Sequence, residues 1–248
     1  LIRPRSIVPL LVLFSGFSGN PNLSAQFTDV SEPWGFSGGG KAAFADYDGD
    51  GWMDLYAGKL FHNEQGKAMS PVESSGLPGG EAIWGDYDND QRPDLFFFTG
   101  AGGLYRNMGE GKFEQVDFPE LPTVNSRGAV WGDFNQDGRL DLFVGGYEVW
   151  EQRVHPDVIF LNQPDGSFKE VWRSPEGACY SARGVAAADL NEDGKIDVYV
   201  SNYRLQPNHL WLNQGEGKFE ESAESYQAAG IGDGLSLIHI SEPTRRTT

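Results

Sequence analysis

The sequence predicts an all-β protein built from four copies of one four-stranded unit. Three observations carry this prediction: a nine-residue acidic motif occurs four times, segments of aromatic and β-branched residues surround each copy, and turn residues separate those segments. The motifs begin at Asp46, Asp86, Asp133 and Asp189, at spacings of 40, 47 and 56 residues. Such self-similarity is typical of repeat architectures, and the spacing matches the four-stranded blades of a β-propeller.

Each unit is expected to begin with a short strand of small residues. These segments contain Ala and Gly and occupy residues 41–45, 81–85, 128–132 and 184–188. We assign them to the innermost strands, because inner strands converge on the axis of a propeller, where large side chains would collide. The acidic motif follows each of them directly.

Three further strands complete each unit. The second strand is apolar and begins at the last aspartate of the motif, at 54–56, 94–98, 141–144 and 197–200. The third strand ends in an asparagine, at 60–63, 104–107, 159–162 and 210–213. A fourth strand follows a glycine-containing turn at 111–116, 166–171 and 217–221, whereas the first unit is degenerate there, with Gly66-Lys67-Ala68.

A single unit of this kind cannot bury both faces of its sheet, but units stacked around an axis can. Residues 26–234 are therefore predicted to form a partial propeller of about four blades. Residues 26–30 resemble the end of a fourth strand, and we expect them to be the outer strand of a closing blade.

The acidic motif has the spacing of a site for a hard cation, above all calcium. Oxygen side chains at positions 1, 3, 5 and 9 and the main-chain carbonyl of position 7 would supply five or more ligands. Carboxylates about 4 Å apart repel by roughly 4 kcal/mol per pair at an effective dielectric of about 20, and a divalent cation reverses that penalty. We predict up to four Ca²⁺ sites, with Trp52, Arg92, Arg139 and Lys195 acting through the main-chain carbonyl. The ligand sets are Asp46, Asp48, Asp50, Trp52 and Asp54; Asp86, Asp88, Asp90, Arg92 and Asp94; Asp133, Asn135, Asp137, Arg139 and Asp141; and Asp189, Asn191, Asp193, Lys195 and Asp197.

Glycine at position 6 permits a tight turn in three motifs, whereas the second motif has Gln91 at position 6 and Pro93 at position 8. An EF-hand would need a glutamate at position 12 and flanking helices, and position 12 holds Ala57, Phe97, Val144 and Val200 instead. The alternative is a set of Asx-turns without metal, in which each Asp or Asn bonds to the local backbone.

Composition excludes some functions. The formal net charge of the 248 residues is −17, and no cluster of Lys and Arg is visible, so a nucleic-acid partner is not expected. Cys179 is the single cysteine, which excludes an intramolecular disulfide.

The two ends of the chain are not expected to belong to the propeller. Residues 1–25 are predicted to be a secretory signal peptide, with Arg3 and Arg5 before an apolar segment at 7–17 and Ala25 before the cleavage site. No stable membrane span is therefore expected after cleavage. Residues 235–248 resemble a translated sequencing adapter and are predicted to be an artefact.

The repeated unit resembles the FG-GAP or VCBS repeats of integrin α-subunit propellers and of secreted bacterial proteins. The sequence from Trp84 to Leu95 and the end of the third strand at Asn107 are similar to those of bacterial proteins that carry an ASPIC/UnbV domain after the repeats. This resemblance covers residues 26–234. It implies calcium in hairpin loops, an extracellular setting and a propeller that often has seven blades, of which this chain would supply about four.

The first functional hypothesis is a secreted, calcium-stabilised scaffold that binds an unknown protein or glycan, located outside the cell, in the periplasm or at the cell surface. The excursion between Asp141 and Ile159 contains Tyr147, Trp150, Arg153 and His155, a mixture common in contact surfaces, although a surface loop with a partly buried aromatic explains it equally well. The alternatives are a carbohydrate-active lyase or hydrolase and a spacer in a larger adhesin. The sequence shows no nucleophile, zinc or phosphate-binding motif, so no catalytic residues are assigned and the chain is not predicted to be an enzyme. We expect His62 and His209 to face outward from their strands.

Overall fold

The computed structural model describes residues 29–30, 33–34, 41–100, 102–122, 126–149, 153–203 and 205–230. The predicted signal peptide, the adapter-like tail and residues 26–28 of the predicted closing strand lie outside these residues. The chain divides into two compact units, Leu1–Ser37 and Gly38–Thr248. In the first, the Trp34 N–H donates to the Val30 carbonyl at 3.0 Å. Everything that follows concerns the second unit.

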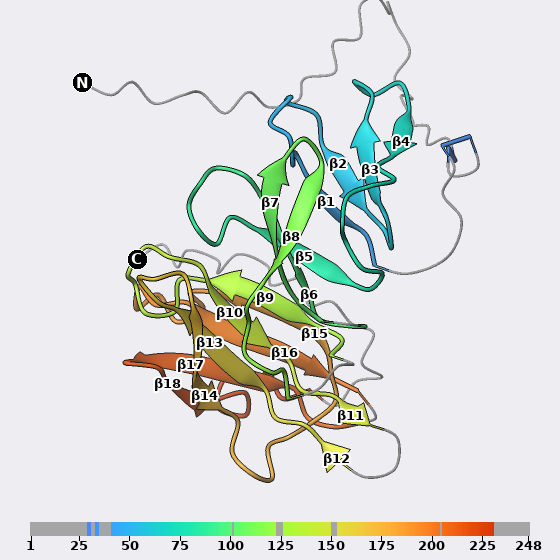
Figure 1. The fold of residues 1–248 in the computed structure, drawn as a ribbon. Coiled ribbons are helices and arrows are strands. Elements are labelled where there is room, and N and C mark those ends of the chain that lie inside the picture. The colour runs from blue at the N-terminus through green and yellow to red at the C-terminus, as the bar shows by residue number, and fades with distance from the viewer. Residues whose placement is uncertain are drawn as a thin grey trace, which may run out of the picture. The chain divides into compact units, whose positions relative to one another are not determined.

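The second unit consists of four antiparallel four-stranded sheets that follow one another in chain order (Figure 1). The first contains β1 (Ala43–Ala45), β2 (Asp54–Tyr56), β3 (Leu60–Asn63) and β4 (Met69–Pro71). The second contains β5 (Ala82–Gly85), β6 (Asp94–Phe97), β7 (Gly103–Gly109) and β8 (Lys112–Val116). The third contains β9 (Ala129–Gly132), β10 (Asp141–Val144), β13 (Val158–Asn162) and β14 (Phe168–Arg173). The fourth contains β15 (Ala182–Ala188), β16 (Asp197–Asn202), β17 (His209–Gly215) and β18 (Lys218–Glu221).

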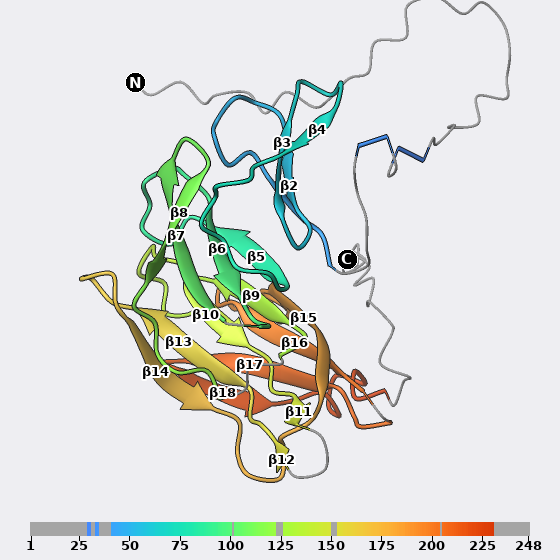
Figure 2. The same ribbon diagram turned by 45° about the vertical axis from the view of Figure 1, so that its right-hand side comes forward.

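These sheets are four blades of a β-propeller, and the predicted all-β fold is confirmed. All regular elements of the described residues are strands, so no helix among them is long or apolar enough to cross a membrane. The degenerate first unit does form a fourth strand, β4. It begins three residues after the turn glycine Gly66, whereas the fourth strands of the other blades begin one or two residues after the corresponding glycine. The long excursion of the third blade contains a small hairpin of β11 (Glu148–Val149) and β12 (Arg153–Val154) (Figure 2).

The first strand of each blade lies innermost and contacts the first strand of the next blade: β1 contacts β5, β5 contacts β9, and β9 contacts β15. The inner strands need small residues because neighbouring blades approach closely there, as predicted. A Cβ added to Gly85 would lie 2.5 Å from Nε1 of Trp131, and one added to Gly128 would lie 2.8 Å from Val185. Tryptophan is nevertheless tolerated on the side of the strand that faces the preceding blade, where the Trp84 indole N–H donates to the Ala43 carbonyl at 3.1 Å.

The hydrophobic core lies between blades, because successive side chains of a strand point to opposite faces. In β6, Leu95 and Phe97 pack toward the first blade, whereas Phe96 packs into the cluster shared with the third. A third cluster joins blades three and four through Phe143 and Val198. Each blade therefore buries its sheet faces against its neighbours, as the repeat predicts.

Position 2 of the acidic motif contributes an aromatic side chain to three of these interfaces. Tyr47 stacks with Trp84 of the next blade at a ring separation of 6.5 Å and an interplanar angle of 7°. Tyr87 contacts Phe168, and Phe134 contacts Phe219, again from one blade to the next. The acidic loop is thus anchored in the hydrophobic core by the residue beside its first ligand.

The third-strand asparagine connects three parts of the molecule. In the fourth blade the Asn213 side-chain amide donates to the carbonyl of Phe134 in the preceding blade at 2.8 Å and to that of Ile196 at 3.1 Å, and its oxygen accepts from the Gly215 N–H at 2.9 Å. Asn107 and Asn162 reach the preceding blade in the same way, through the carbonyls of Tyr47 and Tyr87. The asparagine fixes the spacing of adjacent blades, a role that its recurrence in the sequence did not reveal.

We predict that Asn213→Ala destabilises the protein by roughly 3 kcal/mol, because it leaves buried carbonyl and N–H groups without partners. The matched control is Gln214→Ala, which removes an exposed neighbour and is expected to change the free energy of unfolding by less than about 0.5 kcal/mol. Urea denaturation of both variants measures the difference. Equal stabilities would show that the asparagine does not hold the blades together.

Candidate metal centre

The four acidic loops share one backbone conformation, which the side chain of position 1 holds in place. In the first loop, Oδ1 of Asp46 accepts the Asp50 N–H at 3.0 Å and Oδ2 accepts the Gly51 N–H at 2.9 Å. The corresponding pairs of bonds recur from Asp86, Asp133 and Asp189, at 2.9 to 3.1 Å. Asx-turns accompany these bonds: in the first loop Oδ1 of Asp48 accepts the Asp50 N–H at 3.2 Å and Oδ1 of Asp50 accepts the Trp52 N–H at 2.8 Å. The local backbone bonds of the metal-free alternative are therefore present in the loop.

Position 6 has a left-handed backbone in every loop. The φ angles are 92° at Gly51, 83° at Gly138 and 85° at Gly194, and Gln91 of the second loop has 70°. A non-glycine residue in this region is strained by about 1 kcal/mol. The second loop therefore adopts the common geometry without the glycine.

Position 9 is a buried aspartate at the start of the second strand. Asp54, Asp94, Asp141 and Asp197 are all 0% exposed. In each, one carboxylate oxygen accepts the N–H of the third-strand asparagine at 2.7 to 2.9 Å, and the other accepts the N–H of position 2 at 2.9 to 3.2 Å. We call each position-9 aspartate and its asparagine an Asp–Asn pair.

Burial opposes the charge of these aspartates. Desolvation raises the pKa of Asp94 to about 7 and the pKa values of Asp54 and Asp141 to about 6, although the backbone N–H groups act in the opposite direction. The pKa of Asp197 is raised for the same reason. Nearby loop carboxylates, such as Asp88 beside Asp94, add to the effect. A divalent cation at the loop would relieve both causes, so the buried carboxylates fit such an ion.

The structure brings predicted ligands together in the first two loops. Carboxylate oxygens of Asp46, Asp48 and Asp50 lie within 4.8 Å of one another, and so do those of Asp86, Asp88 and Asp90. In the third and fourth loops Asn135 and Asn191 occupy position 3, and their side-chain oxygens accept the N–H of position 5 at 3.2 and 3.0 Å. The first two loops therefore bring three carboxylates together, whereas the last two have an amide in place of the position-3 carboxylate and so carry a smaller charge.

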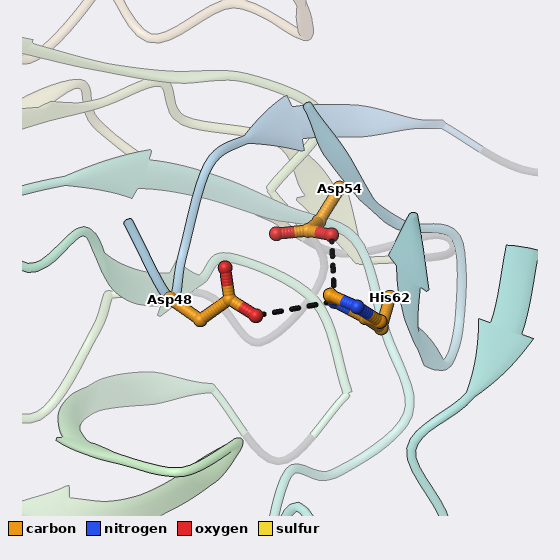
Figure 3. A group of neighbouring side chains, drawn as sticks. All are labelled: Asp48, Asp54 and His62. Atoms are coloured by element: carbon orange, nitrogen blue, oxygen red, sulfur yellow. Dashed lines mark ion pairs between the residues drawn. The ribbon is translucent and has the colours of Figure 1, made fainter. Parts of the chain in front are cut away.

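His62 joins the first loop, which the sequence did not predict. Its Nδ1 lies 3.1 Å from Oδ2 of Asp48 and 3.4 Å from Oδ1 of Asp54 (Figure 3). The register of β3 explains this position, because His62 directly precedes the asparagine of the Asp–Asn pair. The expectation that His62 faces outward is therefore wrong: its side chain points into the acidic loop and is 28% exposed.

Basic side chains also approach the other loops. Arg92 and Arg139, at position 7, form ion pairs with the position-5 carboxylates Asp90 and Asp137. Lys195 pairs with Asp193 at 2.6 Å in the same way. Sequence analysis assigned only the main-chain carbonyls of these residues to the site. Their side chains partly neutralise the loops, and the single basic residue at position 7 of three motifs was the available signal.

The second loop carries one more cation. Arg106 of β7 lies 2.8 Å from Oδ2 of Asp88 and 3.3 Å from Oδ2 of Asp90. Arg106 occupies the place that His62 has in the first blade, directly before the asparagine. Of the first two loops, the second therefore has its charge more fully compensated by protein groups.

The remaining sequence candidates have structural positions of their own. His209 is 4% exposed, stacks on Tyr180 at a ring separation of 4.7 Å and lies 3.7 Å from Asp157, so the expectation that it faces outward is wrong. Tyr147 is buried at the base of the long excursion. The excursion thus begins with a buried aromatic side chain, which agrees with its interpretation as a surface loop with a partly buried aromatic. The side chains of Trp150, Arg153 and their neighbours lie outside the part of the chain whose side chains are described.

We predict that metal-free protein, in excess chelator, loses stability as pH rises from about 4 to 7. The buried aspartates have higher pKa values in the folded than in the unfolded state, so the folded state binds more protons between pH 4 and 7, and their contribution is lost as pH passes about 6 to 7. Denaturant unfolding at a series of pH values measures the slope. Asp117→Asn, at an exposed site, is the control and should leave the slope unchanged; a flat or rising profile would contradict the prediction.

Parts of this chain are similar in sequence to known proteins. The model of the FG-GAP-like repeat matches residues 86–144 and 149–200. Cartilage acidic protein 1 of Xenopus tropicalis is 34% identical over 73 residues, which cover 27% of this chain and 11% of that protein. The chain therefore spans about a tenth of the length of this relative.

Two solved structures are similar in part. A lectin of Agrocybe aegerita that recognises non-reducing terminal N-acetylglucosamine is 20% identical, with a TM-score of 0.46, and the match covers 73% of this chain and 51% of that one. The V. cholerae biofilm matrix protein Bap1 is 16% identical, with a TM-score of 0.46, over 72% of this chain and 27% of that one. The family model confirms the resemblance to FG-GAP repeats over residues 86–144 and 149–200, which include the second, third and fourth acidic motifs.

Proposed function

We propose that this chain is a secreted, calcium-binding β-propeller that serves as a binding scaffold. The observation that carries the proposal is the set of four Asp–Asn pairs. Each places a buried carboxylate with a raised pKa beside a loop of further oxygen ligands, so each loop needs positive charge. FG-GAP β-propeller repeats suggest an interaction scaffold, which agrees with this role.

Calcium would be structural in this proposal. It would be held by the side chains of positions 1, 3, 5 and 9 and the carbonyl of position 7, and it would neutralise the carboxylates that meet there. Basic residues already compensate part of the charge of three loops, at Arg92, Arg139 and Lys195. Weak sites of this kind suit the high calcium concentrations outside cells, where modules bind with dissociation constants of about 0.1 to 1 mM.

The enzyme alternative has less support. FG-GAP propellers are typically non-catalytic. His62 lies among predicted metal ligands, and His209 is buried beneath Tyr180 and Trp211, so neither histidine is placed to act on a substrate at the surface.

We predict that calcium raises the thermal midpoint of the full chain. At ten times the dissociation constant, each occupied site adds about 1.4 kcal/mol to the free energy of unfolding. Calorimetric titration with Ca²⁺ and thermal unfolding in calcium and in chelator measure binding and stabilisation. Asp50→Asn in the first loop is expected to weaken one site, whereas Asp165→Asn, at an exposed aspartate outside the loops, is the control. No heat and no thermal shift would overturn the proposal.

We also predict that Arg106→Leu increases calcium affinity at the second loop. The substitution removes the Arg106 ion pairs with Asp88 and Asp90 at 2.8 and 3.3 Å, whereas Arg92 still pairs with Asp90, so one of the two arginines that compete with the cation is lost. An increase of about three- to tenfold is expected, as for removal of a partly exposed ion pair. The control is Lys112→Leu on the neighbouring strand, whose nearest carboxylate, Glu110, is 3.9 Å away and highly exposed. Unchanged affinity in Arg106→Leu would show that the second loop does not bind the ion.

A further inference from the structure

A second charged cluster lies at the ends of the inner strands away from the acidic loops, and it is basic. Lys41 precedes β1, Arg127 precedes β9, and Arg183 is the second residue of β15, whereas the acidic loops follow the other ends of these strands. Three cations from three blades thus gather in a chain whose formal net charge is −17. We call Lys41, Arg127 and Arg183 the basic cluster.

Aromatic rings hold the basic cluster in place. The guanidinium carbons of Arg127 and Arg183 both lie 5.5 Å from the ring centre of Tyr147, and that of Arg183 lies 4.3 Å from the ring centre of Tyr203. The ammonium group of Lys41 lies 5.1 Å from the ring centre of Phe98. Cation–π contacts of this kind orient the charges without neutralising them. This gives Tyr147, at the start of the long excursion, a definite role.

Glu81 is the carboxylate that pairs with the basic cluster among the described residues. Its Oε2 lies 3.5 Å from Nζ of Lys41, and its Oε1 lies 3.9 Å from a terminal nitrogen of Arg127. Glu81 therefore pairs with two of the three cations, and the four side chains together carry an excess of two positive charges. Burial lowers the pKa of Lys41, and repulsion from Arg127 and Arg183 adds to this effect although Glu81 opposes it.

Three buried atoms of this site have no hydrogen-bond partner. They are Nε of Arg127, Nε of Arg183 and Oε2 of Glu81. An unsatisfied buried polar group costs about 1–3 kcal/mol, more when it is charged, so such atoms are normally paired with protein, water or an ion. The site therefore combines unmatched arginine donors and excess positive charge with a carboxylate oxygen that lies 3.5 Å from the Lys41 ammonium group but accepts no hydrogen bond.

We propose that the basic cluster binds the carboxylate of an acidic sugar. A carboxylate is planar and accepts from arginine donors in a fork geometry. A sugar that carries a carboxylate also carries hydroxyl groups beside it, and one of these can donate to Oε2 of Glu81. A simple carboxylate side chain of a peptide satisfies the cations and offers no such hydroxyl. The negative field of the whole chain opposes polyanions such as nucleic acid.

This inference rests on the proposed function, because it names the ligand class of the scaffold, yet the two are tested separately. Glucuronate, glucose and the α-methylamide of N-acetylaspartate (below, N-acetylaspartate), which carries one carboxylate as glucuronate does, are titrated into the full chain, and binding is followed by protein NMR shifts. We expect glucuronate to bind, glucose not to bind, and N-acetylaspartate to bind more weakly than glucuronate. A calcium titration without sugar, on the same protein, reports on the scaffold independently.

Variants locate the site. Arg127→Gln and Arg183→Gln are each expected to weaken glucuronate binding about tenfold or more, because each removes a charge-assisted donor. Arg183→Lys keeps the charge and loses the planar fork, so a smaller loss is expected. Lys112→Gln, a 66% exposed lysine of β8, is the control and should bind as the wild type does. Thermal unfolding of each variant shows whether it folds. If Arg183→Gln does not fold, the binding of glucuronate by Arg127→Gln tests the site.

The outcomes separate clearly. Calcium binding without glucuronate binding would overturn this inference and leave the scaffold in place. Binding of N-acetylaspartate as tight as that of glucuronate, or tighter, would overturn the assignment of a sugar and indicate an acidic peptide as the ligand. Wild-type affinity in folded Arg127→Gln and Arg183→Gln would show that glucuronate binds elsewhere, which also overturns the assignment.

Discussion

The Asp–Asn pair is the interaction on which the rest of this molecule depends. Its aspartate is buried and accepts two backbone N–H groups, one from the acidic loop and one from the third strand. Among the described residues, an ion pair reaches this aspartate in the first blade alone, from His62 to Asp54. Its asparagine donates to its own loop and, in blades two to four, to the preceding blade. One pair of residues thus closes the loop, joins two strands and fixes the distance to the next blade. Substituting either partner leaves buried polar groups unsatisfied, which is why the pair recurs.

Charge is separated along the inner strands. Acidic loops lie at one end, where side chains of consecutive loops reach one another's backbone, as Gln136 does at the carbonyl of Gly194 at 2.6 Å. The basic cluster lies at the other end of the same strands. Because a carboxylate and a cation at short range attract strongly, this arrangement keeps the two kinds of site from neutralising each other across the blades. One end suits a structural cation, and the other suits an anionic ligand.

The two ends also differ in how they are built. The acidic loops arise from a motif copied four times, so their geometry is repeated by local hydrogen bonds within nine residues. The basic cluster repeats only in part: Arg127 and Arg183 both lie six residues before their motifs, whereas Lys41 and Glu81 both lie five residues before theirs and carry opposite charges. Structure that all blades share is encoded locally, whereas a site that a particular ligand would need is assembled from residues that differ between blades.

The sequence by itself determined the four units, their strand order, the acidic loops and the small inner strands, because hydrophobic period, turn residues and motif spacing act over a few residues. It also marked the asparagine as recurrent without giving its role. Only the tertiary structure decided that Asn213 bonds to Phe134, 79 residues away, and that His62 and Arg106 enter acidic loops. It alone decided that His209 is buried and that Lys41, Arg127 and Arg183 meet. The physical reason is that these contacts join different strands or different blades, and the packing of sheets, which sets them, has no signature in any short stretch of chain.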